Sequence, residues 1–224
     1  MKPRHTAIIL DGNRRYAKKY KLKPWEGHEK GSKNIENLLD WCSELGIKEL
    51  TLYTFSIENF KRKKEEVKFL MMLFRKQMKK LEKDKRIEKN KIKVNFIGRL
   101  NLFPKDIQSS MKRITEKTKK HNKFRINFAM GYGGRAEIID AVNRIIKKGI
   151  KKVDEKIITK NLYLSNEPDL VIRTGGEKRV SNFLIWQSYY SEWYFTKKLW
   201  PEFSKKDLIK AVNDFSRRER RYGA

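Results

Sequence analysis

The sequence predicts a single α/β domain over residues 1–224, with a mostly parallel central sheet of about six strands flanked by helices. Short apolar runs of strand length alternate along the chain with longer segments in which apolar residues recur at helical spacing. A chain of 224 residues also fits one domain, and it contains no internal repeat or low-complexity linker that would divide it.

Six segments have the length and composition of strands, being short, apolar and rich in β-branched or aromatic residues. They are residues 6–10, 49–55, 92–97, 124–130, 169–173 and 192–195. The segments between them favour helices because their apolar residues fall on one face. These helices are predicted over residues 32–45, 63–86, 104–121, 151–164 and 204–221, with one more that ends at residue 148.

Charge and cysteine content restrict the function. The net charge is +28, which favours a partner that carries phosphate: a nucleic acid, an anionic lipid or a phosphorylated substrate. Cys42 is the only cysteine, so an intrachain disulfide is excluded. The apolar run near the N-terminus is too short for a signal peptide, and no run is long enough to span a bilayer. We therefore expect a cytoplasmic protein.

The loops that follow four of the predicted strands are rich in arginine, glycine and small polar residues. Because the carboxyl ends of parallel strands meet at one edge of a sheet, we expect these loops to form one rim. Arginines and free backbone amides bind phosphate oxygens, and a lone aspartate suits Mg²⁺ that bridges to them. The rim therefore favours a site for more than one phosphate group. Its residues are Asp11, Gly12, Asn13 and Arg15; Ser56, Glu58, Asn59 and Arg62; Tyr132, Gly133, Gly134 and Arg135; and Arg173, Gly175, Gly176, Arg179 and Ser181.

Common phosphate and metal motifs are missing. The chain has no G-x-x-x-x-G-K-[ST] loop and no G-x-G-x-x-G fingerprint after its first strand. No two aspartates are adjacent, which excludes the aspartate-rich motif of the all-helical trans-prenyltransferases. Three histidines and one cysteine do not make a convincing zinc site.

Six motifs occur together in one order, and in that order and spacing they resemble the cis-prenyltransferases, the undecaprenyl diphosphate and dehydrodolichyl diphosphate synthases. They are I-L-D-G-N-R-R-Y-A-K, E-G-H, F-S-I-E-N-F-K-R, Y-G-G-R, D-L-V-I-R-T-G-G-E-x-R-x-S-N-F-L-x-W-Q and L-W-P-E-F. The resemblance covers residues 9–223. Tyr16 and the sequence S-I-E-N-F-K-R are closer to those of the archaeal and eukaryotic branch of the family.

The resemblance implies an enzyme that uses Mg²⁺ to condense isopentenyl diphosphate repeatedly onto an allylic primer, farnesyl or geranylgeranyl diphosphate. The product would be a long-chain cis-polyprenyl diphosphate, the precursor of a glycosyl carrier lipid. It also implies a hydrophobic tunnel for the growing chain. Leu70, Met71 and Phe74, on the apolar stripe of the helix over 63–86, would either line that tunnel or belong to the core.

The resemblance also implies a role for each motif residue. Asp11 and Asn59 would be catalytic, and Mg²⁺ would contact Asp11 and Glu192. Residues 56–62 would form a mobile loop that closes over the reacting ends. The allylic diphosphate would be held by Gly12, Asn13, Arg14, Arg15, His28, Ser56, Glu58 and Arg62. Isopentenyl diphosphate would be held by Arg173, Arg179, Ser181, Arg221 and Gly223.

Two details bear on assembly and on substrate binding. Bacterial members often have an arginine where this chain has Pro24, so another group must compensate. The ending Arg221-Tyr222-Gly223 matches an R-x-G motif that, in the family, reaches the partner's isopentenyl site, and this favours a homodimer.

Other functions stay open at this point. The +28 charge would also suit a nucleic-acid-binding protein, but basic and aromatic residues are not interleaved in an RNA-recognition pattern, so we expect no nucleic acid. A non-catalytic partner subunit is disfavoured by the intact Asp11, Arg15, Arg173 and Arg179. The same charge raises the hypothesis of peripheral contact with anionic membranes.

Overall fold

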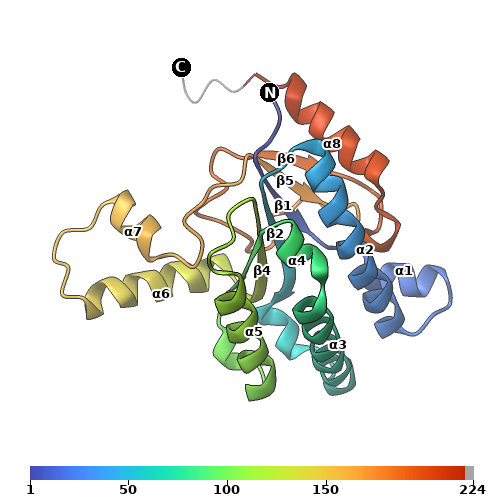
Figure 1. The fold of residues 1–224 in the computed structure, drawn as a ribbon, viewed down its shortest axis with the longest axis horizontal. Helices are drawn as coiled ribbons and strands as arrows, with labels where there is room; N and C mark the ends of the chain where they lie inside the picture. The colour runs from blue at the N-terminus through green and yellow to red at the C-terminus, as the bar shows by residue number, and fades with distance from the viewer. Residues whose placement is uncertain (220–224) are drawn as a thin grey trace.

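A computed structural model describes residues 1–219, and it contains one six-stranded parallel sheet (Figure 1). The strand order is β3-β4-β2-β1-β5-β6, and every neighbouring pair is parallel. The predicted α/β class and the six predicted strands are thus confirmed. The strands are β1 (His5–Ile9), β2 (Glu49–Ser56), β3 (Ile92–Ile97), β4 (Phe124–Tyr132), β5 (Leu170–Arg173) and β6 (Glu192–Phe195).

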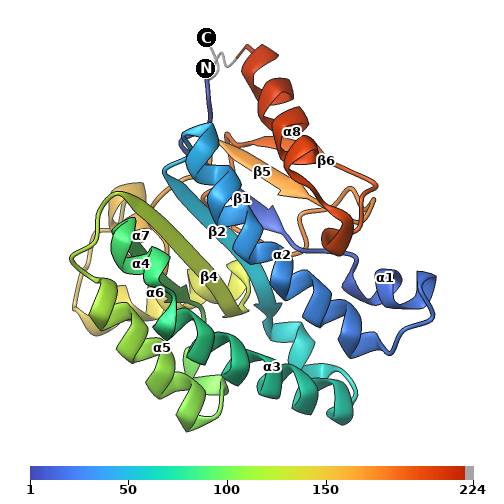
Figure 2. The same cartoon turned by 45° about the vertical axis from the view of Figure 1, so that its right-hand side comes forward.

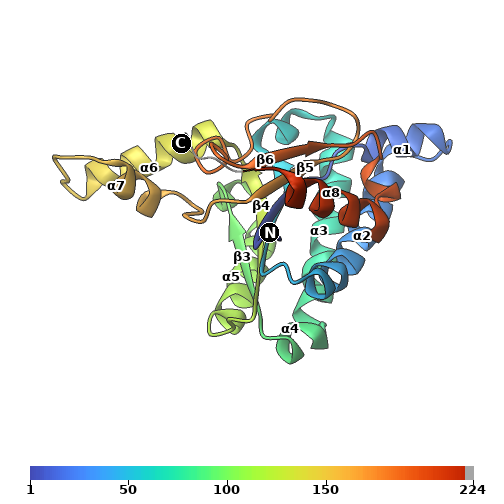
Figure 3. The same ribbon diagram turned by 90° about the horizontal axis from the view of Figure 1, so that it is seen from above.

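Helices pack mainly against one face of the sheet. Figure 2 shows α2, α3, α5 and α8 on that face, and Figures 1 and 3 show α6 and α7 extending sideways from the body of the molecule. The helices are α1 (Asn13–Lys19), α2 (Pro24–Leu45), α3 (Lys64–Lys83), α4 (Lys85–Lys89), α5 (Lys105–Thr118), α6 (Gly134–Lys147), α7 (Glu155–Asn161) and α8 (Lys205–Arg217). Short 3₁₀ helices occupy η1 (Ile57–Lys61), η2 (Leu100–Leu102) and η3 (Trp200–Glu202).

Alternation along β1 divides the core between the two faces of the sheet, since successive side chains of a strand point to opposite faces. Ile8 belongs to the larger cluster, which includes buried residues of α2, α3, α5 and α8. Ala7 and Ile9 belong to the smaller cluster, which is closed by Leu164 and by residues 183–184. All five residues of β1 are buried, the apolar Ala7, Ile8 and Ile9 together with the polar His5 and Thr6.

Two helix boundaries differ from the prediction in ways that affect the site. The helix predicted over 32–45 begins at Pro24, which occupies its first turn, and Glu26 caps it through the Lys23 N–H at 2.7 Å. The predicted helix over 63–86 is interrupted at Asp84. The Asp84 carboxylate accepts a hydrogen bond from the Arg86 N–H at 2.9 Å, and this N-cap starts α4 as a separate helix.

The two other corrections concern helices that are shorter than predicted. The segment 151–164 forms only α7, which Asp154 caps by accepting from the Ile157 N–H at 2.7 Å. The helix predicted over 204–221 ends at Arg217, and Arg218 is already extended. The rest of that prediction lies outside the described residues.

Candidate active site

The centre of the candidate site lies at β1, where the order in which strands are added across the sheet changes direction. Strand β1 has β2 on one side and β5 on the other, with Ile9 in register with both Tyr53 and Arg173. In open α/β sheets, ligands bind outside the carboxyl ends of strands at such a point. Asp11 follows β1 there, and Arg173 ends β5.

Asp11 joins the loops after β1 and β5. One of its carboxylate oxygens pairs with Nη2 of Arg173 at 3.0 Å, and the other pairs with Nη2 of Arg15 at 3.0 Å. The Arg173 side chain also donates from Nη1 to Oγ of Ser181 at 2.7 Å and to the Arg179 carbonyl. Because Arg173 is only 3% exposed, these contacts fix its guanidinium in place.

The backbone at Asp11 is held from two sides. Its carbonyl accepts hydrogen bonds from Oγ1 of Thr174 at 2.7 Å and from the Trp200 N–H at 3.0 Å. Gly12 follows with a φ of 115°, and a Cβ there would lie 2.9 Å from the Leu199 Cα. The D-G step is therefore needed both for its left-handed backbone and for close packing.

Trp200 also ties this loop to α2. Its indole Nε1 donates to the Gly31 carbonyl at 2.8 Å, and its own carbonyl accepts from Nδ2 of Asn34 at 2.9 Å. The beginning of α1 packs on the same stretch of α2, where a Cβ at Gly31 would lie 2.2 Å from Oδ1 of Asn13. The helix glycine thus permits two segments to approach closely.

His28 faces the same cavity from α2. Its Nε2 lies 3.6 Å from Oε1 of Glu66, and that oxygen pairs with Nη1 of Arg62 at 3.0 Å. Burial and the positive charge of Arg62 lower the pKa of His28 from 6.5 to about 4. His28 is therefore neutral at pH 7, and its Nε2 has no hydrogen-bond partner among the described residues.

The segment after β2, expected as a polar loop, forms the 3₁₀ helix η1. Oδ1 of Asn59 accepts from the Ser56 N–H at 3.2 Å and completes a capping box at its start. Oε1 of Glu58 accepts from Nδ2 of Asn182 at 3.2 Å, which links η1 to the loop after β5.

These residues line one cavity of about 1280 Å³. Its rim carries the arginines, and its interior is apolar, with Ile35, Leu39, Leu70, Phe74 and Phe128 among the lining residues. Met71 instead belongs to the buried core cluster. The predicted site residues that line the cavity are Asp11, Gly12, Asn13, Arg14, Arg15, His28, Ser56, Glu58, Asn59, Arg62, Arg173, Arg179 and Ser181.

Glu192 does not join this set. It is the first residue of β6, in register with Leu170 at the amino edge of the sheet, and it accepts a hydrogen bond from Arg218. Asp11 lies beyond the opposite ends of the strands, so the two carboxylates cannot contact one Mg²⁺ within a single chain. The structure therefore does not bring the two together in one chain, and the Mg²⁺ contact of Glu192 stays a prediction. Arg221 and Gly223 lie outside the described residues.

The loop after β4 was also expected at the rim, but it is anchored elsewhere. The Gly134 N–H donates to the Asn182 carbonyl at 2.7 Å, and the Arg135 N–H donates to Oδ1 of Asn182 at 2.9 Å. Tyr132 is fully buried and donates its hydroxyl to Glu137. This loop therefore supports the one after β5 instead of lining the cavity.

Sequence reasoning missed three supporting residues. Glu66 is four positions after Arg62, a helical ion-pair spacing that could have revealed it. Thr174 directly follows Arg173 and could have been read as part of the same loop. Trp200 carries no local signal that indicates its bond to the Asp11 carbonyl.

Known proteins are similar to this chain over nearly its whole length. Residues 9–223 match the family model described as "Putative undecaprenyl diphosphate synthase". This chain belongs to that family, the cis-prenyltransferases. Its sequence is 48% identical to that of the tritrans,polycis-undecaprenyl-diphosphate synthase (geranylgeranyl-diphosphate specific) of Pyrococcus abyssi, and the match covers 99% of this chain and 87% of the relative. It is 47% identical to the protein of the same name from Methanocaldococcus jannaschii, with 99% and 82% covered.

Solved structures agree with the family assignment. The lavandulyl diphosphate synthase from Lavandula x intermedia, in complex with dimethylallyl diphosphate, superposes with a TM-score of 0.91 at 33% identity over 100% of this chain and 99% of that one. A probable undecaprenyl diphosphate synthase from Campylobacter jejuni gives 0.85 at 35% identity, with both chains fully covered. Members of the family act on isopentenyl and allylic diphosphates and generally use a divalent metal. Within residues 1–219, no helix has the length and apolar character needed to cross a bilayer.

Proposed function

We propose that this cis-prenyltransferase adds isopentenyl diphosphate repeatedly to farnesyl or geranylgeranyl diphosphate and releases a long-chain cis-polyprenyl diphosphate, the precursor of a glycosyl carrier lipid. The observation that carries the proposal is the single cavity, which joins an arginine-rich rim to an apolar interior. Such a cavity suits a ligand with a diphosphate at one end and a hydrocarbon at the other. The relatives named as geranylgeranyl-diphosphate specific favour that primer.

The arginines fall into two groups that suit two diphosphates. Arg14, Arg15 and Arg62 would hold the allylic diphosphate, and Arg173 and Arg179, with Ser181, would hold isopentenyl diphosphate. One guanidinium group can bind two phosphate oxygens through two of its N–H groups. Its positive charge also stabilises the negative charge that grows as the allylic diphosphate departs. Because Asp11 contacts an arginine of each group at 3.0 Å, two substrates bound there would lie side by side.

Asp11 suits a Mg²⁺ that also takes oxygens from the substrates. No group of three or more His, Cys, Asp or Glu that could hold a metal occurs in residues 1–219. A carboxylate at the arginine-rich rim of this cavity fits the usual Mg²⁺ arrangement of one or two carboxylates, substrate phosphates and water. When bound, the ion would neutralise phosphate charge. Asp11 would hold it, and Arg15, whose side chain is 44% exposed, can turn from Asp11 to a phosphate.

An apolar face of α6 supports the homodimer. Ile139, Val142 and Ile146 recur at helical spacing, and all three are exposed on a helix that extends from the body (Figures 1 and 3). Contiguous apolar patches of this kind mark protein–protein contacts. The proposed placement is cytoplasmic, and the +28 charge supports peripheral contact with anionic lipid.

The test uses purified protein, Mg²⁺, labelled isopentenyl diphosphate and a set of allylic primers. We expect lipid-soluble label with farnesyl or geranylgeranyl diphosphate. Asp11→Ala should lose nearly all turnover yet still bind isopentenyl diphosphate, because the arginines remain. Asp106→Ala removes an exposed aspartate whose partner, Arg75, lies outside the cavity, and it should leave turnover unchanged.

Two outcomes would count against the proposal. Turnover by Asp11→Ala at the wild-type rate would exclude the role of that carboxylate. No lipid-soluble product with any primer, together with tight RNA binding at physiological salt, would favour a nucleic-acid-binding protein instead.

A further inference from the structure

The chain that follows β5 has an unusual backbone conformation where it meets the cavity. Ser181, Asn182 and Leu184 have φ angles of 47°, 61° and 44°, all in the left-handed region. Residues other than glycine disfavour this region, and such strain persists only where the surrounding contacts enforce it. The contacts of this segment therefore decide its position.

Two of these contacts come from the sheet. Oγ of Ser181 accepts a hydrogen bond from Nη1 of Arg173 at 2.7 Å, and its carbonyl accepts one from the Tyr53 hydroxyl at 3.4 Å. Phe183 is fully buried and stacks on Tyr53, with ring centroids 4.6 Å apart. The residues on both sides of Asn182 are thus attached to the ends of β2 and β5.

The side-chain amide of Asn182 is used at both of its ends. Its Oδ1 accepts from the Arg135 N–H at 2.9 Å, and its Nδ2 donates to Oε1 of Glu58 at 3.2 Å. An amide offers a donor and an acceptor, whereas an ionised carboxylate can only accept. Asparagine is also among the few residues that tolerate the left-handed backbone. Its side chain and its backbone both suit this position.

The contact with Glu58 joins the two halves of the proposed active site. Glu58 belongs to η1, which leads to Arg62 on the allylic side, and Asn182 directly follows Ser181 on the isopentenyl side. All four residues line the cavity. Within residues 1–219, no other hydrogen bond or ion pair joins η1 to residues 174–182.

We propose that Asn182 is a positioning residue, which holds η1 against the loop after β5 and so fixes the two substrates relative to each other. The inference rests on the proposed function. Each diphosphate keeps its own arginines without this contact, so both substrates still bind. Their reacting carbons must nevertheless meet in one geometry, and a displacement of about 1 Å can slow such a step by about a hundredfold. Loss of the contact therefore affects the rate more than the binding.

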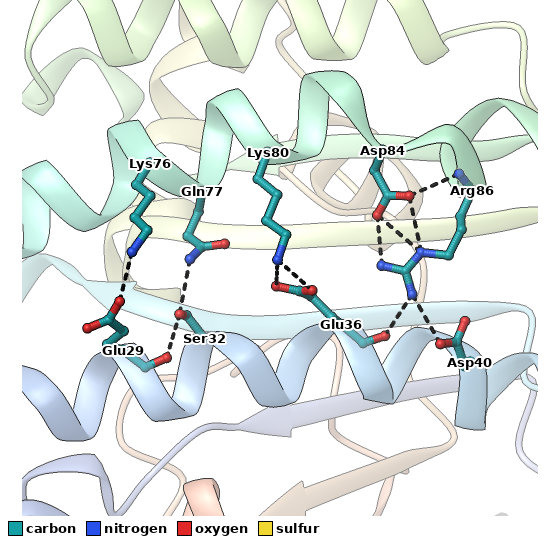
Figure 4. Close-up of polar contacts among 9 residues, drawn as sticks. All are labelled: Glu29, Ser32, Glu36, Asp40, Lys76, Gln77, Lys80, Asp84 and Arg86. Carbon is teal, nitrogen blue, oxygen red and sulfur yellow. Dashed lines mark hydrogen bonds and ion pairs between the residues drawn. The ribbon is translucent and has the colours of Figure 1, made fainter.

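The rest of the cavity wall does not depend on Asn182. Figure 4 shows a row of polar contacts that joins α2 to α3 and α4. In this row, Lys76 pairs with Glu29 at 2.8 Å, and Lys80 pairs with Glu36 at 2.7 Å. Removal of the Asn182 side chain should consequently free η1 while α2 and α3 keep their packing.

The first variant is Asn182→Gly, because glycine keeps the left-handed backbone and removes only the amide. We measure the rate of a single condensation and the KM of each substrate, at a temperature at which thermal unfolding shows every variant to be folded. The rate should fall by about tenfold or more, and each KM should change by less than about twofold. Lys76→Ala is the control, since it breaks a contact between α2 and α3 whose two residues do not line the cavity, and it should leave the rate unchanged.

An exchange of donor and acceptor tests the partner. In Asn182→Asp the carboxylate can still accept from the Arg135 N–H, but it repels Glu58, so this variant should also be slow. In the double variant Asn182→Asp with Glu58→Gln, the glutamine donates to the aspartate and the net charge equals that of the wild type. Its rate should return to that of Glu58→Gln alone.

The outcomes separate this inference from the proposed function. If the wild type makes no polyprenyl product, the proposed function fails. If the wild type is active and Asn182→Gly is equally fast, the positioning role is wrong while the function stands. A raised KM at an unchanged rate would overturn the role too, because Asn182 would then bind a substrate directly. Equal slowing by Lys76→Ala, or a double variant as slow as Asn182→Asp, would also overturn it.

Discussion

The neutral state of His28 leads to a prediction about the pH dependence of stability. Burial and the charge of Arg62 lower the pKa of His28 from 6.5 to about 4, a difference of roughly 2.5 units. One unit corresponds to about 1.36 kcal/mol, so full protonation of His28 should destabilise the folded state by about 3 kcal/mol. Because the folded pKa lies below the unfolded one, the unfolded chain binds the proton more tightly. The penalty is absent above pH 6.5 and grows as the pH falls toward 4.

The variant His28→Gln isolates this effect, because an amide keeps polar atoms at the position but cannot be protonated. Urea unfolding of both proteins between pH 7.5 and 4 gives the difference in their unfolding free energies. As the pH falls from 7.5 to 4, we expect the unfolding free energy of the variant to rise by about 2 to 3 kcal/mol relative to that of the wild type. Burial also lowers the pKa of His5, but His5 is present in both proteins and cancels in the difference. A difference that does not change with pH would refute the lowered pKa of His28 and would mean that Glu66, 3.6 Å away, offsets the effect of burial.

Two more predictions concern Arg173 and α6. Arg173→Met removes the buried contacts of Arg173 with Asp11 and Ser181, and it should lower the unfolding free energy by about 3 to 5 kcal/mol. The side chain of Arg179 is 63% exposed, so Arg179→Met should change the unfolding free energy by less than about 1 kcal/mol. Equal losses in urea unfolding would contradict a special role for Arg173. Ile146→Asp should convert a dimer to a monomer in size-exclusion chromatography with light scattering, while Lys147→Asp keeps the dimer; a monomeric wild type at micromolar concentration would exclude the α6 interface.

Five of the strands, β1 to β5, could be predicted from the sequence because most of their residues are buried in a parallel sheet, which favours a continuous or alternating apolar run. The start of α2 could not. Its first turns contain Gly27 and Gly31, and glycine is a poor helix former. The reason for these glycines is tertiary: a Cβ at Gly27 would lie 2.1 Å from the Asn13 carbonyl oxygen. That contact joins two helices and leaves no local signal.

The convergence of the loops was predictable from topology, but their division of roles was not. The carboxyl-edge rule placed Asp11 and Arg173 together, and they form an ion pair. The same rule placed the loop after β4 at the rim of the cavity. In the structure this loop does not line the cavity; the backbone N–H groups of Gly134 and Arg135 donate to Asn182. Glu192 was assigned a Mg²⁺ contact from its motif alone. A motif does not show whether a residue lies at the amino or the carboxyl end of its strand, and therefore whether it lies near Asp11.

The rim arginines differ in burial and in the partners that hold them. Four of the rim arginines already have an acid partner: Arg15 and Arg173 share Asp11, Arg62 has Glu66, and Arg179 has Glu177. A diphosphate bound by these four must therefore replace carboxylates, and this exchange is easiest where the side chain is exposed, as in Arg15 and Arg179. Arg173 is buried and donates to three groups, so it cannot move without leaving them unpaired. We infer that Arg173 sets the position of the bound diphosphate, whereas the exposed arginines close onto it from either side.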